Sequence, residues 1–286
     1  MQRKPLPFIL FGLLVSCGPS QSSGKTIVAS FYPIYFLASQ IAGNQYTVTN
    51  LTPAGSEPHD FQLTPKGRAA LEDADLIFVN GLGMETWTSS LDERLSLKTH
   101  ALSDGIDTLD IEGRVDPHIW LDLDNYLLMG KAVREALEEA DPTHSSIYLS
   151  NYRTFSRNIL TLWNACMDIT REFNGKVIAV SHAAYGYLCK QHGIEQLYIN
   201  GLSPDDKPQA QSLGKIMDAM RERGIDTIFF EELVSPEIAE YIASQTGAKV
   251  DSLNPLESLE QKDIDAGKDY FSVYLENMRK IAKTKP

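Results

Sequence analysis

Val177-Ile178-Ala179-Val180-Ser181 is an apolar run of strand-forming residues, and it echoes Thr26-Ile27-Val28-Ala29-Ser30, 151 residues earlier. Two further pairs of segments repeat at the same offset: Leu51-Thr52-Pro53 with Leu202-Ser203-Pro204, and Asp75-Leu76-Ile77-Phe78 with Asp226-Thr227-Ile228-Phe229. A single match of this kind is trivial, because all strand–helix–strand units look alike. Three matches in one register indicate two lobes with the same strand order.

Within each half, short β-rich runs alternate with helical patterns, which is typical of parallel sheets covered by helices. In the first half we expect strands near 26–30, 46–51, 76–79 and 101–102, with helices at 34–42 and 65–73. In the second half we expect strands near 177–180, 196–199, 227–230 and 249–253, with helices at 185–191, 209–223 and 236–246. Gly224 and Gly247 follow two of these helices, as helix-ending glycines do.

A long helical stretch separates the halves. One helix fits residues 122–139 and is closed by Asp141-Pro142, and a second runs from about residue 142 to residue 172 without an internal Pro or Gly. Some thirty residues at 1.5 Å each span roughly 45 Å, enough to run along both lobes. We therefore predict an α/β fold with two similar lobes of parallel-type sheet flanked by helices, at 25–141 and 175–286, joined by a long rigid connecting helix at 142–174.

The N-terminus has the pattern of a targeting segment. Arg3 and Lys4 precede a short apolar core at 7–15, which falls below the ~20 residues that a spanning helix needs. Leu14-Val15-Ser16-Cys17 is similar to a bacterial lipoprotein cleavage box. We expect a signal peptide at 1–16, lipid on Cys17, a flexible tether at 17–24, and a place in the bacterial cell envelope on the periplasmic or extracellular face of the membrane. The alternative is an ordinary secretory signal with a chance cysteine.

Charge and cysteine content exclude some partners. Loss of residues 1–16 leaves 24 basic and 38 acidic residues, a formal charge of −14. Such a surface repels nucleic acid and mildly concentrates cations, so no nucleic-acid partner is expected. An oxidising envelope would allow Cys166 and Cys189 to pair, but two buried thiols on separate helices are the simpler expectation.

Three of the six histidines each follow a predicted strand. His59 lies in Glu57-Pro58-His59-Asp60, His118 lies in Asp116-Pro117-His118-Ile119, and His182 ends the run from Val177. Strand ends converge on the cleft of an open α/β sheet, and imidazole is the commonest metal ligand. Three imidazoles with one carboxylate would make a tetrahedral zinc site. His144 and His192 lie at helix ends and His100 enters a strand, where a histidine needs no metal.

The residues alone leave the fourth ligand open. Glu231 and Glu232 follow a strand, but acids at the start of the next helix are favoured by its dipole. Glu257 follows Leu253-Asn254-Pro255-Leu256 and precedes no obvious helix. Asp60 and Asp116 could accept hydrogen bonds from the outer ring nitrogens of ligand histidines, or could be solvated acids.

Together these segments resemble the zinc-type solute-binding lipoproteins of bacterial ABC importers, in the metal-binding solute-binding protein family 9. The resemblance covers nearly all of the mature chain. It rests on PHDFQLTP at 58–65, DPHIWLD at 116–122, SHAAYGY at 181–187, GLSP at 201–204, FFE at 229–231 and LNPLE at 253–257.

The resemblance implies two α/β lobes joined by a rigid helix, with metal held between them by His59, His118 and His182. Manganese members typically have Glu and Asp as third and fourth ligands, so His182 points to zinc. Some zinc members have Asp-Pro-Leu where this chain has Asn254-Pro255-Leu256, and because Asn254 is a poor zinc ligand we expect Glu257 as the fourth. The His/Asp-rich loop of many zinc members is absent, since 81–115 contains only His100.

The sequence therefore predicts a monomeric, lipid-anchored protein that captures Zn²⁺ outside the cytoplasm and delivers it to the membrane permease of an ABC importer. Zn²⁺ would be the transported ligand, and no enzyme activity is expected. Borderline-soft Zn²⁺ suits three imidazoles better than Mn²⁺ does, whereas affinity order alone would also admit Cu²⁺ or Ni²⁺. The alternatives are a manganese or other divalent-metal binder of the same class, a zinc hydrolase with an open coordination position, and an additional adhesin role.

Overall fold

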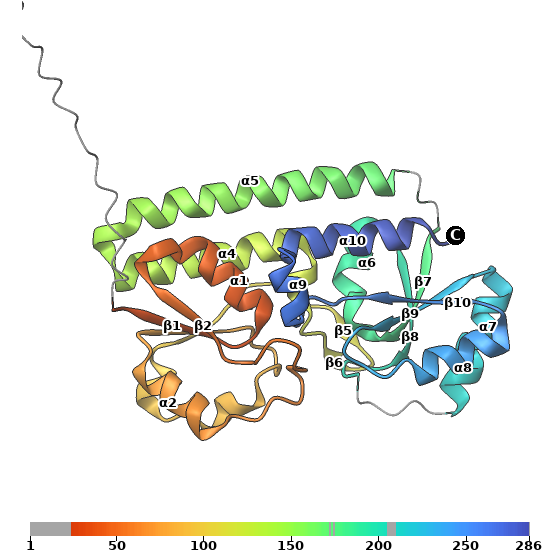
Figure 1. The fold of residues 1–286 in the computed structure, drawn as a ribbon, viewed down its shortest axis with the longest axis horizontal. Coiled ribbons are helices and arrows are strands. Elements are labelled where there is room, and N and C mark those ends of the chain that lie inside the picture. The colour runs from red at the N-terminus through yellow and green to blue at the C-terminus, as the bar shows by residue number, and fades with distance from the viewer. Residues whose placement is uncertain (1–23, 172, 174, 205–209, 286) are drawn as a thin grey trace, which may run out of the picture.

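Two four-stranded parallel sheets form the centres of two lobes (Figure 1). The computed structural model describes residues 24–171, 173, 175–204 and 210–285, so the predicted signal peptide, Cys17 and nearly all of the tether lie outside the described residues. The first sheet has the order β2-β1-β3-β4 and contains β1 (Thr26–Ala29), β2 (Thr47–Asn50), β3 (Leu76–Val79) and β4 (Thr99–Ala101). The second has the order β10-β9-β7-β8 and contains β7 (Val177–His182), β8 (Glu195–Asn200), β9 (Thr227–Glu231) and β10 (Lys249–Leu253).

The two sheets have the same topology. In each lobe the first strand of the chain lies between the second and the third, and the fourth lies beyond the third, all in parallel. β1 and β7 also begin 151 residues apart, at Thr26 and Val177, as the sequence repeat requires. The predicted pair of similar parallel lobes is confirmed.

Successive side chains along the strands enter different cores, so each sheet has two apolar faces. In β1, Ile27 and Ala29 join a large inner core, whereas Val28 faces an outer core with Leu71. In β7, Ile178 and Val180 join the same inner core, and Val177 and Ala179 face a separate outer core. Since side chains alternate faces along a strand, this is the pattern of sheets buried on both sides.

Helices cover these faces. On the first lobe lie α1 (Tyr32–Ala42), α2 (Pro65–Asp73), α3 (Glu93–Ser96) and α4 (Leu123–Ala140), and on the second lie α6 (Gly186–His192), α7 (Ala210–Arg223), α8 (Glu237–Thr246), α9 (Gln261–Asp265) and α10 (Tyr270–Ala282). α5 (Ser145–Thr170) runs along both lobes and packs on α1, α4 and α10 (Figure 1). Its 26 residues span about 39 Å, somewhat less than expected, because Pro142–His144 form a separate 3₁₀ turn.

The helix α10, the short helices α3 and α9, and a small hairpin are additions to the predicted elements. Asp269 caps α10 through a capping box with Ser272. The inner face of α10 buries Tyr270, Val273 and Tyr274. The hairpin pairs β5 (Asp110–Ile111) with β6 (Arg114–Val115) around Glu112 and Gly113, both of which have positive φ. That conformation is typical of the tight turns of hairpins, and Gly113 adopts it without strain.

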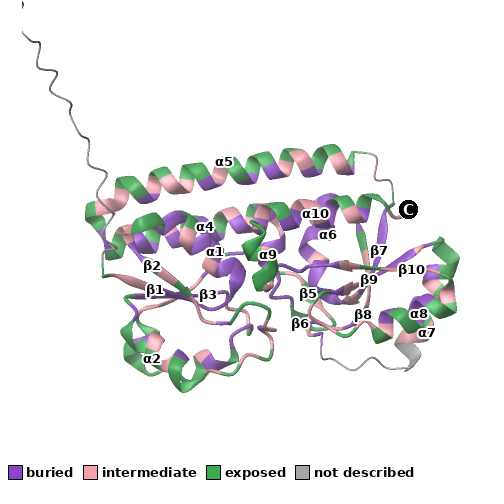
Figure 2. Ribbon diagram, viewed as in Figure 1, coloured by how far each residue is buried: buried purple, intermediate pink, exposed green. Residues whose placement is uncertain are grey.

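One continuous core joins the lobes, and Figure 2 shows buried residues on the inner sides of both. Tyr270 of α10 stacks on Tyr126 of α4, with ring centroids 4.2 Å apart. Between the lobes, the Trp120 indole N–H donates to the Pro255 carbonyl at 2.8 Å, and the Tyr270 hydroxyl donates to the Trp120 carbonyl at 2.5 Å. No helix among the described residues is long and apolar enough to cross a bilayer.

Candidate metal site

The four residues predicted to bind zinc meet between the lobes, each from a different segment. His182 is the last residue of β7, and Glu257 lies in the loop between β10 and α9. His59 lies in the loop between β2 and α2, well beyond the end of β2 at Asn50, and His118 follows the β5–β6 hairpin, which is outside the parallel sheet. The expectation that each histidine directly follows a sheet strand is therefore wrong for His59 and His118, although all four side chains come together.

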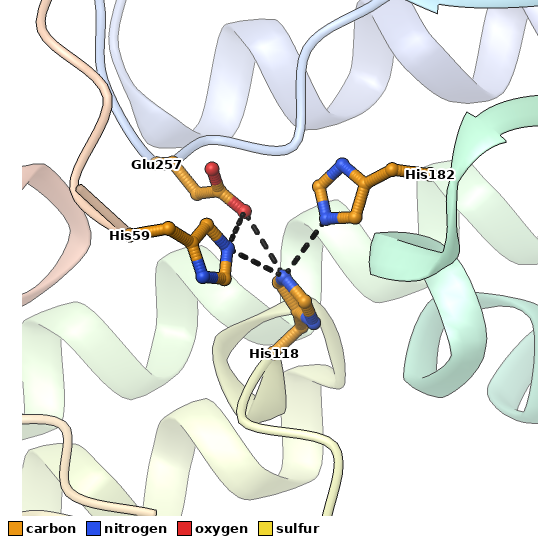
Figure 3. Close-up of side chains that lie close together, drawn as sticks. All are labelled: His59, His118, His182 and Glu257. Carbon is orange, nitrogen blue, oxygen red and sulfur yellow. Dashed lines mark hydrogen bonds and ion pairs between the residues drawn. The ribbon is translucent and has the colours of Figure 1, made fainter. Parts of the chain in front are cut away.

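The side chains point at one another (Figure 3). The Nε2 atom of His118 lies 3.2 Å from Nε2 of His59 and 3.2 Å from Nε2 of His182. Oε1 of Glu257 lies 3.4 Å from Nε2 of His59 and 3.1 Å from Nε2 of His118. Ligands at 2.0–2.1 Å around a tetrahedral zinc lie about 3.3 Å apart, so these separations fit such a site.

The site is buried. His118 and His182 have no exposed surface, and 2 % of Glu257 is exposed. His59 is the most accessible of the four, with 11 % of its side chain exposed. Burial alone would raise the pKa of the Glu257 carboxyl, but the charges and hydrogen bonds of His59 and His118 hold it well below its usual value. Burial alone would lower the pKa of His118, but the carboxylates of Asp116 and Glu257 raise it to about 10.

Two carboxylates fix the orientation of two of the rings. Asp116 Oδ1 lies 2.7 Å from Nδ1 of His118, and Glu231 Oε1 contacts Nδ1 of His182. An ionised carboxylate only accepts hydrogen bonds, so Nδ1 of each ring carries a proton and Nε2 is the nitrogen left to bind a metal ion once the ring is neutral. Zinc would replace the remaining proton of His118, and the 3.2 Å between Nε2 of His118 and Nε2 of His182 is the spacing of two ligands of one ion. The arrangement is that of a cation site.

Glu231 has a role that the sequence analysis missed. We expected it near the start of the following helix, in solvent or away from the histidines, but it is 2 % exposed and contacts His182. The register that pairs Val180 with Phe229 places Glu231 level with His182 two residues later. The adjacency of β7 and β9 is the signal that could have revealed this contact, and it required the strand order.

Glu232 and Asn254 support the loop that carries Glu257. The Asn254 side chain donates to Oε2 of Glu232 at 3.2 Å and accepts from the backbone N–H of Leu256 at 2.7 Å. This bond closes a turn in which Leu256 has a φ of 63°, an unusual value for a residue with a side chain. Asn277 of α10 holds the backbone N–H and carbonyl of Asn254 at 3.1 and 2.6 Å. Asn254 therefore shapes the turn that directs Glu257 to the histidines.

The remaining histidines lie elsewhere. His100 in β4 lies against Phe78, His144 bonds to Asp141 at 2.7 Å, and His192 lies between Trp163 and Tyr274. Cys166 and Cys189 are buried free thiols on α5 and α6, so the expectation of two unpaired cysteines is confirmed.

Comparison with known proteins gives one consistent result. Residues 27–284 match the family described as zinc-uptake complex component A, periplasmic. The chain is 32 % identical to the high-affinity zinc uptake system protein ZnuA of Bacillus subtilis, over 94 % of this chain and 92 % of that protein. It is 31 % identical to the zinc-binding lipoprotein AdcA of Streptococcus pneumoniae, covering 95 % of this chain but only 58 % of AdcA.

Solved structures agree in fold. The Zn(II)-bound ZnuA-like domain of Streptococcus pneumoniae AdcA superposes with a TM-score of 0.80 at 32 % identity, over 91 % of this chain and 98 % of that one. The laminin-binding protein of Streptococcus agalactiae, described as an adhesin with metal-transporting activity, gives 0.81 at 30 % identity, over 91 % and 97 %.

Proposed function

This chain belongs to the family of periplasmic zinc-uptake components A, and from that premise we propose that it captures Zn²⁺ outside the cytoplasm and delivers it to the permease of an ABC importer. His59, His118, His182 and Glu257 would hold the ion as cargo. A lipid on Cys17 would keep the protein at the membrane as a monomer.

The observation that carries this proposal is the set of inward-facing donor atoms. Three imidazole nitrogens and one carboxylate oxygen lie within 4.8 Å of one another. Three imidazoles match the preference of Zn²⁺, whereas Mn²⁺ favours more oxygen ligands. The manganese alternative is the weaker one for this reason.

The same donor set argues against the hydrolase alternative. A catalytic zinc keeps three protein ligands and an open position for water, while four protein ligands close the coordination shell. Oε1 of Glu257 lies 3.4 Å from Nε2 of His59 and 3.1 Å from Nε2 of His118, which is the spacing of two ligands of one ion. Glu257 would therefore fill the fourth position. Capture and release of the ion then remain as the function of the site.

Metal analysis of the protein tests the proposal. The full mature chain, purified without chelator, should contain about one zinc per chain. Mn²⁺ in large excess should fail to displace it. His118→Ala should abolish this zinc, and His100→Ala, a change outside the group, should retain it. A wild-type protein that carries no zinc, or that exchanges zinc for manganese at equal concentrations, would rule the proposal out.

A further inference from the structure

The β5–β6 hairpin comes from the first half of the chain but lies against the second lobe (Figure 1). Its base is closed by the backbone N–H of Asp116, which donates to the Leu109 carbonyl at 2.9 Å. The Tyr187 hydroxyl of α6 contacts both ends of this base. It accepts from the Leu109 N–H and donates to the Asp116 carbonyl, each at 2.9 Å. One buried hydroxyl of the second lobe therefore holds the segment that leads to His118.

Asp116 and His118 form a rigid unit. Oδ1 of Asp116 accepts from the backbone N–H of His118 at 3.0 Å, and the same oxygen lies 2.7 Å from Nδ1 of the His118 ring. Both residues are fully buried. Because one carboxylate oxygen holds the backbone and the ring together, a shift of Asp116 carries the imidazole with it. The position of Nε2 of His118 therefore depends on where Asp116 lies.

Gly186 gives α6 a second close contact with Asp116. The backbone of Gly186 is helical, with φ of −54° and ψ of −47°, so its conformation does not require glycine. The space around it does, because a Cβ atom on Gly186 would lie only 2.9 Å from Oδ2 of Asp116. The carboxylate could not yield freely to such an atom, since its other oxygen is bound to His118. The missing side chain thus lets Asp116 approach α6.

The element that carries His182 also holds Asp116. His182 ends β7, and a buried 3₁₀ turn at Ala183–Tyr185 leads directly into α6. We propose that Tyr187 is a positioning residue for zinc binding: acting through Asp116, its hydroxyl sets Nε2 of His118 at 3.2 Å from Nε2 of His182. That separation suits two ligands of one zinc ion. The inference rests on the proposed function, since it takes both histidines as zinc ligands.

Tyr198 supplies a matched control. Its hydroxyl donates to Oε1 of Glu112 at 3.3 Å, so it also joins the second lobe to the β5–β6 hairpin. That contact is exposed and lies at the tip of the hairpin, whereas Tyr187 holds the base beside Asp116. Tyr198→Phe therefore removes the same group from the same hairpin without disturbing the unit that carries His118.

Zinc binding by Tyr187→Phe in the full mature protein tests the proposal. Competition with a chelator gives the Kd, transfer to excess chelator gives the release rate, and the visible absorption of bound Co²⁺ reports the coordination geometry. We expect the Kd of Tyr187→Phe to rise about tenfold, mainly through faster release. The Co²⁺ spectrum should change because His118 is no longer held in place. Tyr198→Phe should keep the wild-type Kd, release rate and spectrum.

Gly186→Ala tests the same route with the Tyr187 hydroxyl intact. The added methyl group should displace the Asp116 carboxylate and with it His118, so we again expect about tenfold weaker zinc binding and a changed Co²⁺ spectrum. Ala favours a helix more than Gly does, so a loss of affinity here would not come from a weakened α6. Chemical unfolding measures the stability of each variant separately.

The remaining outcomes overturn the inference. Wild-type affinity, release and spectrum in Tyr187→Phe would make its hydroxyl a purely structural contact, even if the variant is less stable. Equal losses in Tyr187→Phe and Tyr198→Phe would assign the effect to general attachment of the hairpin. Wild-type behaviour of Gly186→Ala would show that Asp116 does not transmit the position of α6 to His118. A wild-type protein that binds no zinc would contradict the proposed function, an outcome distinct from all of these.

Discussion

The two lobes share one strand order but use equivalent positions differently. At the offset of 151 residues, His182 at the end of β7 corresponds to Phe31 after β1, and Glu231 at the end of β9 corresponds to Asn80 after β3. In the second lobe these residues form the contact between a histidine ring and its supporting carboxylate. In the first lobe Phe31 packs edge-on against Trp120, with centroids 5.1 Å apart, and Asn80 donates to the Pro117 carbonyl at 2.9 Å.

The difference shows that the scaffold repeats and the site does not. The second lobe places His182 directly on a strand end, whereas the first lobe supplies His59 and His118 from loops. Asn80 reaches the site only indirectly, through the backbone beside His118. The sheet therefore fixes His182 alone, whereas the second-lobe ligand Glu257 and both first-lobe ligands lie in loops that local hydrogen bonds hold in place.

The largest expected effect is the loss of zinc affinity when a histidine ligand is removed from either lobe. We expect His182→Ala and His118→Ala each to weaken zinc binding on the order of 10²–10³-fold, because a four-ligand zinc site worth about 10–16 kcal/mol loses roughly a quarter of its ligands. Competition with a chelator of known affinity measures the change, and circular dichroism checks that each variant is folded. A His182 variant that binds zinc within threefold of wild type would contradict the account.

The equivalent positions Glu231 and Asn80 sharpen the comparison. Glu231→Gln removes the charged acceptor at Nδ1 of His182, and we expect zinc affinity to fall about 10–100-fold. Asn80→Ala leaves the Pro117 carbonyl without its donor, and should lower stability by about 1–3 kcal/mol while affinity stays within about threefold. Isothermal titration and chemical unfolding separate the two effects. Equal losses of affinity in both variants would show that the lobes are alike in function as well as in topology.

The sequence predicted the repeated scaffold of the two lobes better than the local arrangement of the site. The repeat at one offset predicted both sheets. It also contained a sign of α10, the longest helix that we did not predict, because α4 at Leu123–Ala140, moved by 151 residues, overlaps α10 at Tyr270–Ala282. The four candidate ligands came from motif and resemblance. The loop positions of His59 and His118 could not be predicted, because no sheet register governs them. The contact between Glu231 and His182 depends on the pairing of β7 with β9, which sequence patterns do not specify.

Low pH should weaken zinc binding because it protonates His118, a ligand from the first lobe. Because Asp116 and Glu257 outweigh burial and raise the pKa of His118 to about 10, the metal-free ring carries a proton at neutral pH, which zinc must displace. Lowering the pH then favours the protonated, metal-free form, and we expect affinity to fall about tenfold per pH unit for each proton displaced. Titrations from about pH 8 to about pH 5 measure the slope. A flat profile would contradict a site built on histidines.

The smallest expected effect is on the arrangement of the lobes. α5 has no internal Pro or Gly to bend it, and the core that joins the lobes includes the stacked pair Tyr126 and Tyr270. We expect zinc to order loops around His59 and Glu257 without wide closure. Small-angle scattering should give the same radius of gyration with and without zinc, and a marked compaction would show that the lobes move as separate bodies.

Anomalous diffraction at the zinc absorption edge tests the central claim most directly. The account predicts one strong peak between the lobes, at ~2.0–2.1 Å from Nε2 of His59, His118 and His182 and from a carboxylate oxygen of Glu257. A peak bound by the three histidines and a water, with Glu257 remote, would open the coordination shell and favour a catalytic zinc. A peak away from these histidines would contradict the assignment of the site altogether.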